Sequence, residues 1–186
     1  MHRIAEIIVA YLEKESIIEN SFDDRCIYIY GFETGIYTLF STLLLLFFGL
    51  TFGRLRETFI LISVFYLNQT IGGGYHADTH WGCISIMLLG LVAYIIFHSY
   101  LPSKAFLIII CISSIIVLFL CPLVLHKNKE YLRKYSGSLI SRSHLVVFFE
   151  AVFGIVLLTH DYPDFRSYTY AISISALSRF VAYLMQ

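Results

Sequence analysis

Apolar residues along this chain form one amphipathic stretch followed by six longer apolar segments, with short polar stretches between them. Residues 1–21 alternate apolar and charged positions with the period of a helix. Five side chains share the apolar face: Ile4, Ile7, Ile8, Tyr11 and Leu12. The stretch therefore predicts an amphipathic helix, either lying in a membrane interface or packed as a soluble cap on the rest of the protein.

The six apolar segments are near the length of roughly 20 residues that a helix needs to cross a bilayer core. They cover approximately residues 29–52, 58–71, 81–101, 105–125, 145–159 and 168–185. The second and fifth are short, and the sixth is rich in serine and contains Arg179. The pattern predicts an all-α, polytopic helical membrane protein. We expect four to six transmembrane helices and the N-terminal interfacial helix, in a single domain of residues 1–186.

Composition supports a membrane protein and argues against a nucleic-acid partner. The chain is 58% hydrophobic and 14% charged, whereas soluble domains carry about a quarter charged residues. Its formal net charge is zero, and duplex binding would need a concentrated basic face. We expect no cleaved signal, because charged residues such as Glu6 and Glu13 interrupt the N-terminal stretch.

Basic residues set the predicted orientation. The loop of residues 126–144 contains five lysines and arginines and a single acid, Glu130. With six spans, a cytoplasmic location of this loop puts both chain ends and residues 72–80 in the cytoplasm as well. Attraction of the loop to anionic lipid head groups is one further interpretation of its charge.

The stretch Gly72-Gly73-Gly74-Tyr75-His76, with Cys83 seven residues after the histidine, carries the candidate chemistry. If this stretch is helical, His76, His80 and Cys83 form one polar stripe, and Asp78 falls on the opposite side. A polar stripe near lipid predicts a functional site. The alternative is a structural stripe in which the glycines permit close helix packing.

Two chemistries fit such a stripe. In one, a histidine takes the proton of the Cys83 thiol, and the thiolate attacks a peptide carbonyl to give a thioester. In the other, His76, His80 and Cys83 bind zinc, but no fourth ligand is evident in the sequence. We therefore expect neither a metal nor another cofactor. Cys111 and Cys121 lie in apolar segments and are expected to be inert packing residues.

The stretch GGGYHADTHWGC resembles the signature of the accessory gene regulator B family, membrane peptidases of Gram-positive quorum sensing. The matching residues are Gly73, Gly74, His76, Ala77 and Cys83. The resemblance extends to the chain length, the amphipathic N-terminus, the several apolar segments and the basic loop after the fourth of them.

The resemblance implies a cysteine endopeptidase in the cell membrane, with its active site on the cytoplasmic side. Such an enzyme removes the C-terminal tail of a short precursor peptide. It then passes the acyl group to an internal cysteine or serine, which closes a thiolactone or lactone ring in a signalling peptide. By this analogy Cys83 is the nucleophile and His76 the general base.

The resemblance and the spacing suggest further contacts around these two residues. Substrate or oxyanion contacts are expected from Gln69, Gly73, Gly74 and His80. The expected partners are the precursor peptide and membrane lipids, and the resemblance also implies a homodimer. Docking of an acidic precursor tail is a second interpretation of the basic loop.

The sequence departs from the family pattern at one point. Family members usually carry an arginine just before the glycines, whereas this chain has Asn68-Gln69-Thr70 there. The role of that arginine is thus either lost or taken by another residue. Gln69 remains able to hydrogen-bond a peptide carbonyl.

Acids within apolar segments leave a second function class open. Glu33 and Glu150 are candidates to orient a histidine, to pair with Arg179 or to line a water-filled path. A small membrane transporter or channel lined by these acids and by histidines is therefore the alternative to a peptidase.

Overall fold

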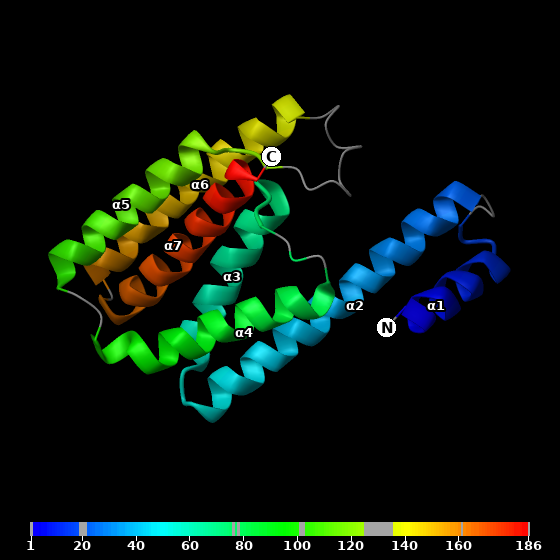
Figure 1. The fold of residues 1–186 in the computed structure, drawn as a ribbon, viewed down its shortest axis with the longest axis horizontal. Coiled ribbons are helices and arrows are strands. Elements are labelled where there is room, and N and C mark those ends of the chain that lie inside the picture. The colour runs from blue at the N-terminus through cyan, green and yellow to red at the C-terminus, as the bar shows by residue number, and fades with distance from the viewer. Residues whose placement is uncertain are drawn as a thin grey trace. The chain divides into compact units, whose positions relative to one another are not determined.

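The structure is a computed structural model that describes residues 2–18, 22–75, 77, 79–100, 103–124, 136–160 and 162–185. Within these residues the regular elements are helices (Figure 1), and a single isolated β-bridge joins Gly73 and Val124. The helices are α1 (His2–Lys14), α2 (Phe22–Thr51), α3 (Leu55–Ile71), α4 (His80–Phe97), a 3-10 turn η1 (His98–Tyr100), α5 (Lys104–Leu120), α6 (Ser136–His160) and α7 (Tyr162–Leu184). Each apolar segment predicted from the sequence is a helix, which confirms the all-α class.

Within the described ranges, two helices are long and apolar enough to cross a membrane by themselves: residues Arg25–Thr51 of α2 and all of α6, Ser136–His160. Residues Trp81–Phe97 of α4 and Lys104–Leu120 of α5 are apolar but shorter. Large apolar side chains nevertheless cover the outside of α5, where Ile109 is 63% and Leu120 is 70% exposed. The predicted total of four to six spans stays a prediction beyond the two long helices.

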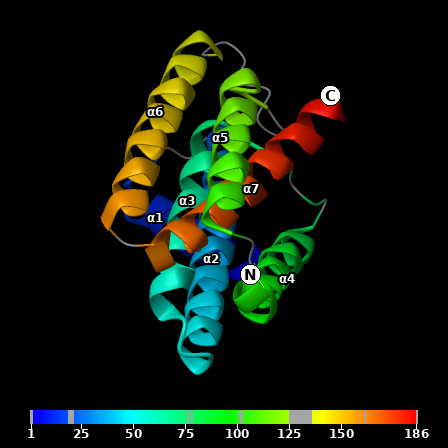
Figure 2. The same cartoon turned by 90° about the vertical axis from the view of Figure 1, so that its left-hand side faces the viewer.

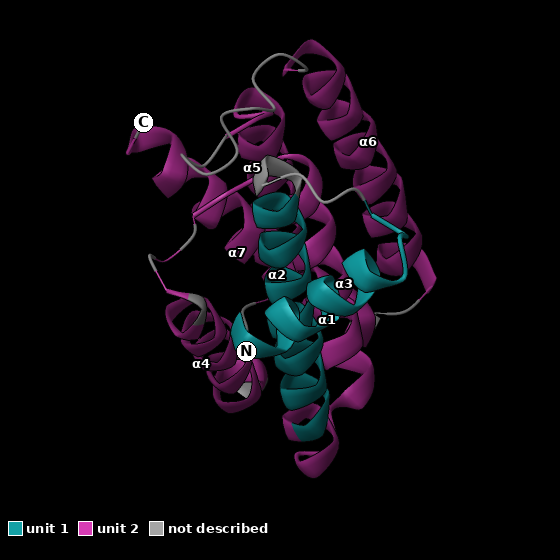
Figure 3. Ribbon diagram, turned by 90° about the vertical axis from the view of Figure 1, so that its right-hand side faces the viewer, with its two compact units in different colours: residues 1–47 teal, residues 48–186 magenta. Residues whose placement is uncertain are grey.

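The chain forms two compact units, residues 1–47 and residues 48–186, and the division falls inside α2 (Figure 3). In the first unit, His2 of α1 bonds Glu33 of α2, with Nδ1 2.9 Å from Oε2. Helix α1 forms as predicted. Its buried residues are Ala5 and Val9, whereas Ile4, Ile7 and Tyr11 of the predicted apolar face are exposed. Its location at a lipid interface, and the single domain, stay predictions.

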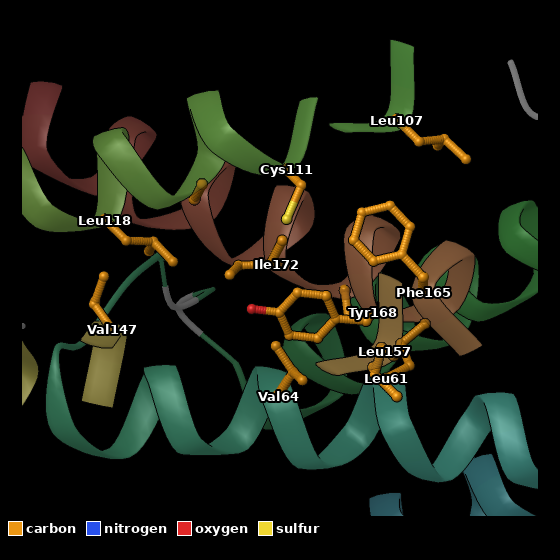
Figure 4. Close-up of a cluster of buried hydrophobic side chains, with 12 residues drawn as sticks. Leu61, Val64, Leu107, Cys111, Leu118, Val147, Leu157, Phe165, Tyr168 and Ile172 are labelled. Carbon is orange, nitrogen blue, oxygen red and sulfur yellow. The ribbon is translucent and has the colours of Figure 1, made fainter. Parts of the chain in front are cut away.

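In the second unit, α7 packs against α3, α5 and α6 (Figures 1 and 2). Their shared core is shown in Figure 4 and consists of Leu61, Val64, Leu107, Cys111, Leu118, Val147, Leu157, Phe165, Tyr168, Ala171, Ile172 and Ala176. Helix α4 contacts α7 through two tyrosines. Tyr94 bonds the hydroxyl of Ser167 at 2.8 Å, and Tyr170 donates to the carbonyl of Gly90 at 2.8 Å. Helix α7 thus connects the core to the helix that carries Cys83.

Candidate functional site

The glycine motif forms a tight turn after α3. Gly72 caps the helix and donates its N–H to the carbonyl of Asn68 at 2.9 Å. Gly73 has a φ of +74°, a left-handed conformation that side-chain-bearing residues rarely adopt. Val124, which follows α5, donates its N–H to the Gly72 carbonyl at 2.8 Å and forms a parallel bridge with Gly73. The turn is therefore tied to a segment about fifty residues further along the chain.

Each glycine of the turn is close to a different neighbour. A Cβ on Gly72 would collide with the guanidinium of Arg179, and one on Gly73 would collide with the Val124 carbonyl. A Cβ on Gly74 would lie 2.8 Å from Oε1 of Gln69 and 2.9 Å from Oγ of Ser178. The glycines therefore permit close approach of neighbours from α3, from α7 and from the segment after α5.

Helix α4 begins at His80 and not at the histidine of the glycine motif. Thr79 is the N-cap, and its Oγ1 accepts the N–H of Gly82 at 3.1 Å. The premise of one continuous helix from His76 to Cys83 is therefore wrong. Residues 72–75 are fixed by the turn, and a hydroxyl side chain starts the helix only at residue 80. The placement of Asp78 on the opposite face depended on the same premise and no longer holds.

Cys83 lies in the first turn of α4. Its N–H donates to the carbonyl of Thr79 at 3.2 Å, and its thiol is half-buried. The sulfur lies 4.0 Å from the carbonyl oxygen of Ala77. The candidate nucleophile is thus on a capped helix and faces the backbone of the segment between the turn and the helix.

Two polar groups of the predicted site, residue His76 and the side chain of His80, lie outside the described part of the structure, as does Asp78 between them. The pairing of His76 with Cys83 and the roles of His80 therefore stay predictions. The zinc alternative needs the same groups and is likewise untested.

Gln69 lies beside the turn, as its predicted role at the site requires. Its side chain is buried. One end of its amide bonds the hydroxyl of Ser178 at 3.0 Å, and the other end has no hydrogen-bond partner among the described residues. The same Ser178 accepts the N–H of Tyr75 with both its carbonyl and its hydroxyl, each at 3.1 Å. The contact of Gln69 with substrate stays a prediction, as do those of Gly73 and Gly74.

Arg179 is the residue near the turn that sequence reasoning did not assign to the site. Its side chain is 1% exposed. It donates to Leu118 O at 3.3 Å, Ser143 Oγ at 3.1 Å, Asn68 O at 3.1 Å and Asn68 Oδ1 at 2.9 Å. The signal was present as an arginine within an apolar segment, but only packing brings α7 against α3. A guanidinium therefore does lie beside the glycines, although it comes from a distant helix.

The two acids that lie within apolar segments, Glu33 and Glu150, have defined partners. Glu150 accepts a hydrogen bond of 2.6 Å from the Asn68 amide, so Asn68 connects this carboxyl to Arg179. Glu33 bonds His2, as described above. The suggested pairing of Glu150 with Arg179 is thus made through an intervening side chain. Cys111 and Cys121 are buried, as predicted.

These features describe a helical membrane protein in which a fixed glycine turn leads to a thiol at the start of a helix. The chain belongs to the accessory gene regulator B family, which matches it over residues 5–185. It is also 32% identical over 83 residues to protein FsrB of Enterococcus faecalis (strain ATCC 47077 / OG1RF). That match covers 44% of this chain and 34% of the relative, so it spans about a third of the relative's length. No solved structure matches the chain.

Proposed function

We propose that this protein is a membrane-embedded cysteine endopeptidase that processes the precursor of a quorum-sensing signal peptide. It cleaves the C-terminal tail of a short precursor and transfers the acyl group to an internal cysteine or serine of the same peptide. Membership of the accessory gene regulator B family supports the role in peptide processing.

One structural observation carries the assignment to Cys83. A fixed turn ends at Tyr75, directly before His76, and a capped helix begins at His80 with Cys83 in its first turn. Residues Tyr75 and Thr79, which flank the candidate base in the sequence, are therefore held, and the candidate nucleophile lies in the first turn of the helix. A base and a nucleophile that are close in the sequence and lie next to such fixed elements suit a proton transfer between two residues.

The chemistry follows in two acyl transfers. His76 takes the proton of the Cys83 thiol, and the thiolate attacks the scissile carbonyl of the precursor. The C–N bond breaks as His76 returns the proton to the leaving amine, which leaves the precursor as a thioester on Cys83. The internal thiol or hydroxyl then attacks this thioester, so that the ring closes and Cys83 regains its proton.

A site at the membrane boundary favours ring closure over hydrolysis. Exchange of one thioester for another is nearly balanced, whereas hydrolysis is strongly favourable. Limited access of water, together with the high effective concentration of a group on the same peptide, lets the internal nucleophile react first.

The direct test is substitution of the cysteines in vesicles that contain the protein and a candidate precursor. We expect Cys83→Ala and Cys83→Ser to abolish processing, because neither side chain can form the thioester. Cys111→Ala and Cys121→Ala should retain it, because those thiols are buried packing groups. Normal cleavage by the Cys83→Ala protein would contradict the proposal.

Two further measurements separate the alternatives. Processing that survives a strong zinc chelator favours thiol catalysis over a metal site. A peptidase should also have one reactive cysteine that the precursor protects from alkylation, whereas a transporter lined by acids need not. Mass spectrometry of an acyl-enzyme trapped on Cys83 would identify the intermediate.

A further inference from the structure

Arg179 is charged, buried and held from several sides. Each of its two terminal nitrogens bonds two oxygens, and these oxygens belong to α3, α5 and α6. Burying a charge is unfavourable unless good hydrogen bonds compensate for the lost water. Asn68 contributes two of the four oxygens and also reaches the carboxyl of Glu150 at 2.6 Å. An arginine with this geometry restrains the groups that it bonds, and therefore also the backbone attached to them.

One of these partners, Asn68, also bonds the glycine turn. The Asn68 carbonyl that accepts from Arg179 at 3.1 Å also accepts the first N–H of the turn, from Gly72, at 2.9 Å. The guanidinium itself fills the space where a Cβ of Gly72 would be. The first hydrogen bond of the turn is thus made to the same Asn68 carbonyl oxygen that Arg179 bonds.

The next residue back on α7 holds the other end of the turn. Ser178 accepts the N–H of Tyr75 twice, at 3.1 Å on its carbonyl and 3.1 Å on its hydroxyl, and it bonds the amide of Gln69. Two adjacent residues of α7 therefore fix the first and the last residue of the turn. The chain position that follows is His76.

We propose that Arg179 is a positioning residue for the proposed reaction: through Asn68 and Gly72 it fixes the glycine turn that directly precedes His76 in the sequence. The inference rests on the proposed function, because it concerns the base of that reaction. Arg179 itself does not touch the reacting atoms. It acts through the backbone of the turn.

The geometry also makes this role specific to arginine. The acceptors lie around both terminal nitrogens, and the planar guanidinium reaches them simultaneously. A lysine has one nitrogen at the end of a flexible chain and cannot serve both groups. Arg179→Lys should therefore retain the charge and lose the positioning.

The test uses the purified protein in lipid vesicles, with Arg179→Gln and Arg179→Lys. We expect both variants to process the precursor with kcat lower by about 100-fold, the loss expected for a small displacement of a catalytic group, and with little change in KM. Alkylation of Cys83 by iodoacetamide at neutral pH should slow to the rate of the His76→Ala protein. Arg3→Gln, which removes the same charge from an exposed position on α1, is the matched control and should behave as the natural protein does.

Cys111 reports on the integrity of the bundle in the same experiment, because it lies in the core. The proposal requires that Cys111 stay unreactive while the Cys83 rate falls. If Cys111 becomes reactive in step with the loss of processing, Arg179 only supports the fold and the proposal is overturned. Unchanged kcat and Cys83 reactivity in both variants would overturn it as well.

Ser178→Ala is a milder second variant, because it removes one of the two bonds to Tyr75 and the bond from the Gln69 amide, and leaves the buried charge in place. We expect a smaller fall in kcat of the same kind. No fall at all would argue against control of the turn from α7. Failure of the proposed function is separate from these outcomes: it would appear as normal processing by His76→Ala or Cys83→Ala, in proteins where Arg179 is intact.

Discussion

Gly73 shows most directly why the motif needs glycine. Its φ of +74° is unfavourable for residues with a side chain, and a Cβ would collide with the Val124 carbonyl. A Cβ on Gly72 would likewise collide with Arg179. A Cβ on Gly74 would come too close to the side chains of Gln69 and Ser178. The turn therefore requires glycines for its own structure, independently of any contact with substrate.

We expect Gly73→Ala to destabilise the protein by more than about 1 kcal/mol, because the backbone must leave the left-handed region or displace Val124. Gly35→Ala is the control. Gly35 lies in α2 with open space around it, so alanine should be neutral or stabilising there by up to about 1 kcal/mol. Thermal unfolding in detergent measures both. Equal effects of the two substitutions would contradict the strain at Gly73.

Helix α4 depends on its cap for the position of Cys83. Thr79 supplies the side-chain oxygen for Gly82 and the carbonyl for Cys83. The first turn of this helix therefore depends on a single residue, Thr79.

Thr79→Ala should cost about 1 kcal/mol, the usual value of a lost N-cap. The loss should be local, with faster hydrogen exchange at the N–H groups of Gly82 and Cys83 and slower processing. Thr159→Ala, at an exposed position near the end of α6, should leave both quantities unchanged. Unaltered exchange at Gly82 in the Thr79 variant would show that the cap does not hold the turn.

The contact of α1 with α2 is predicted to depend on pH. The hydrogen bond with Glu33 raises the pKa of His2 above its ordinary value of 6.5, and Glu6 adds to the effect. A raised pKa means that the contact is fully stabilising below pH 6.5 and weakens as the pH rises through the pKa of the folded protein. Protease protection of α1 should fall over that window.

Glu33→Gln tests the cause of this dependence. It should lower the pKa of His2, followed by NMR titration of the imidazole, and remove most of the change in protection. A pKa that stays raised in this variant would assign the effect to another group.

For the molecule as a whole, the cysteines are markers of both burial and topology. Cys26 is exposed and Cys83 is half-buried, whereas Cys111 and Cys121 are buried. The predicted orientation puts the first two on the cytoplasmic side. A membrane-impermeant maleimide should therefore label Cys26 and Cys83 from that side of oriented vesicles and leave the other two unlabelled. Labelling of Cys26 and Cys83 from opposite sides would refute the predicted number of spans between them.

The helices could be predicted from the sequence because an apolar segment of roughly 20 residues is long enough to be a membrane-spanning helix. Residues 105–125, for example, became α5 with an offset of a few residues. The start of α4 was harder, because a threonine followed by no acid or amide at the third helical position is a weak signal. The contact of Arg179 with Asn68 was beyond prediction, because it joins residues 111 positions apart through the packing of α7 on α3.

The bridge between Gly73 and Val124 affects how insertions elsewhere in the chain should be interpreted. Val124 directly precedes the stretch that leads into the basic loop, and its N–H is bonded to Gly72 at 2.8 Å. We therefore expect an epitope tag or fluorescent protein spliced next to Val124 to disturb the glycine turn. Loss of signal-peptide production by such a fusion would not by itself prove that the loop recognises the precursor, and charge-reversing substitutions that preserve loop length are the more informative probe.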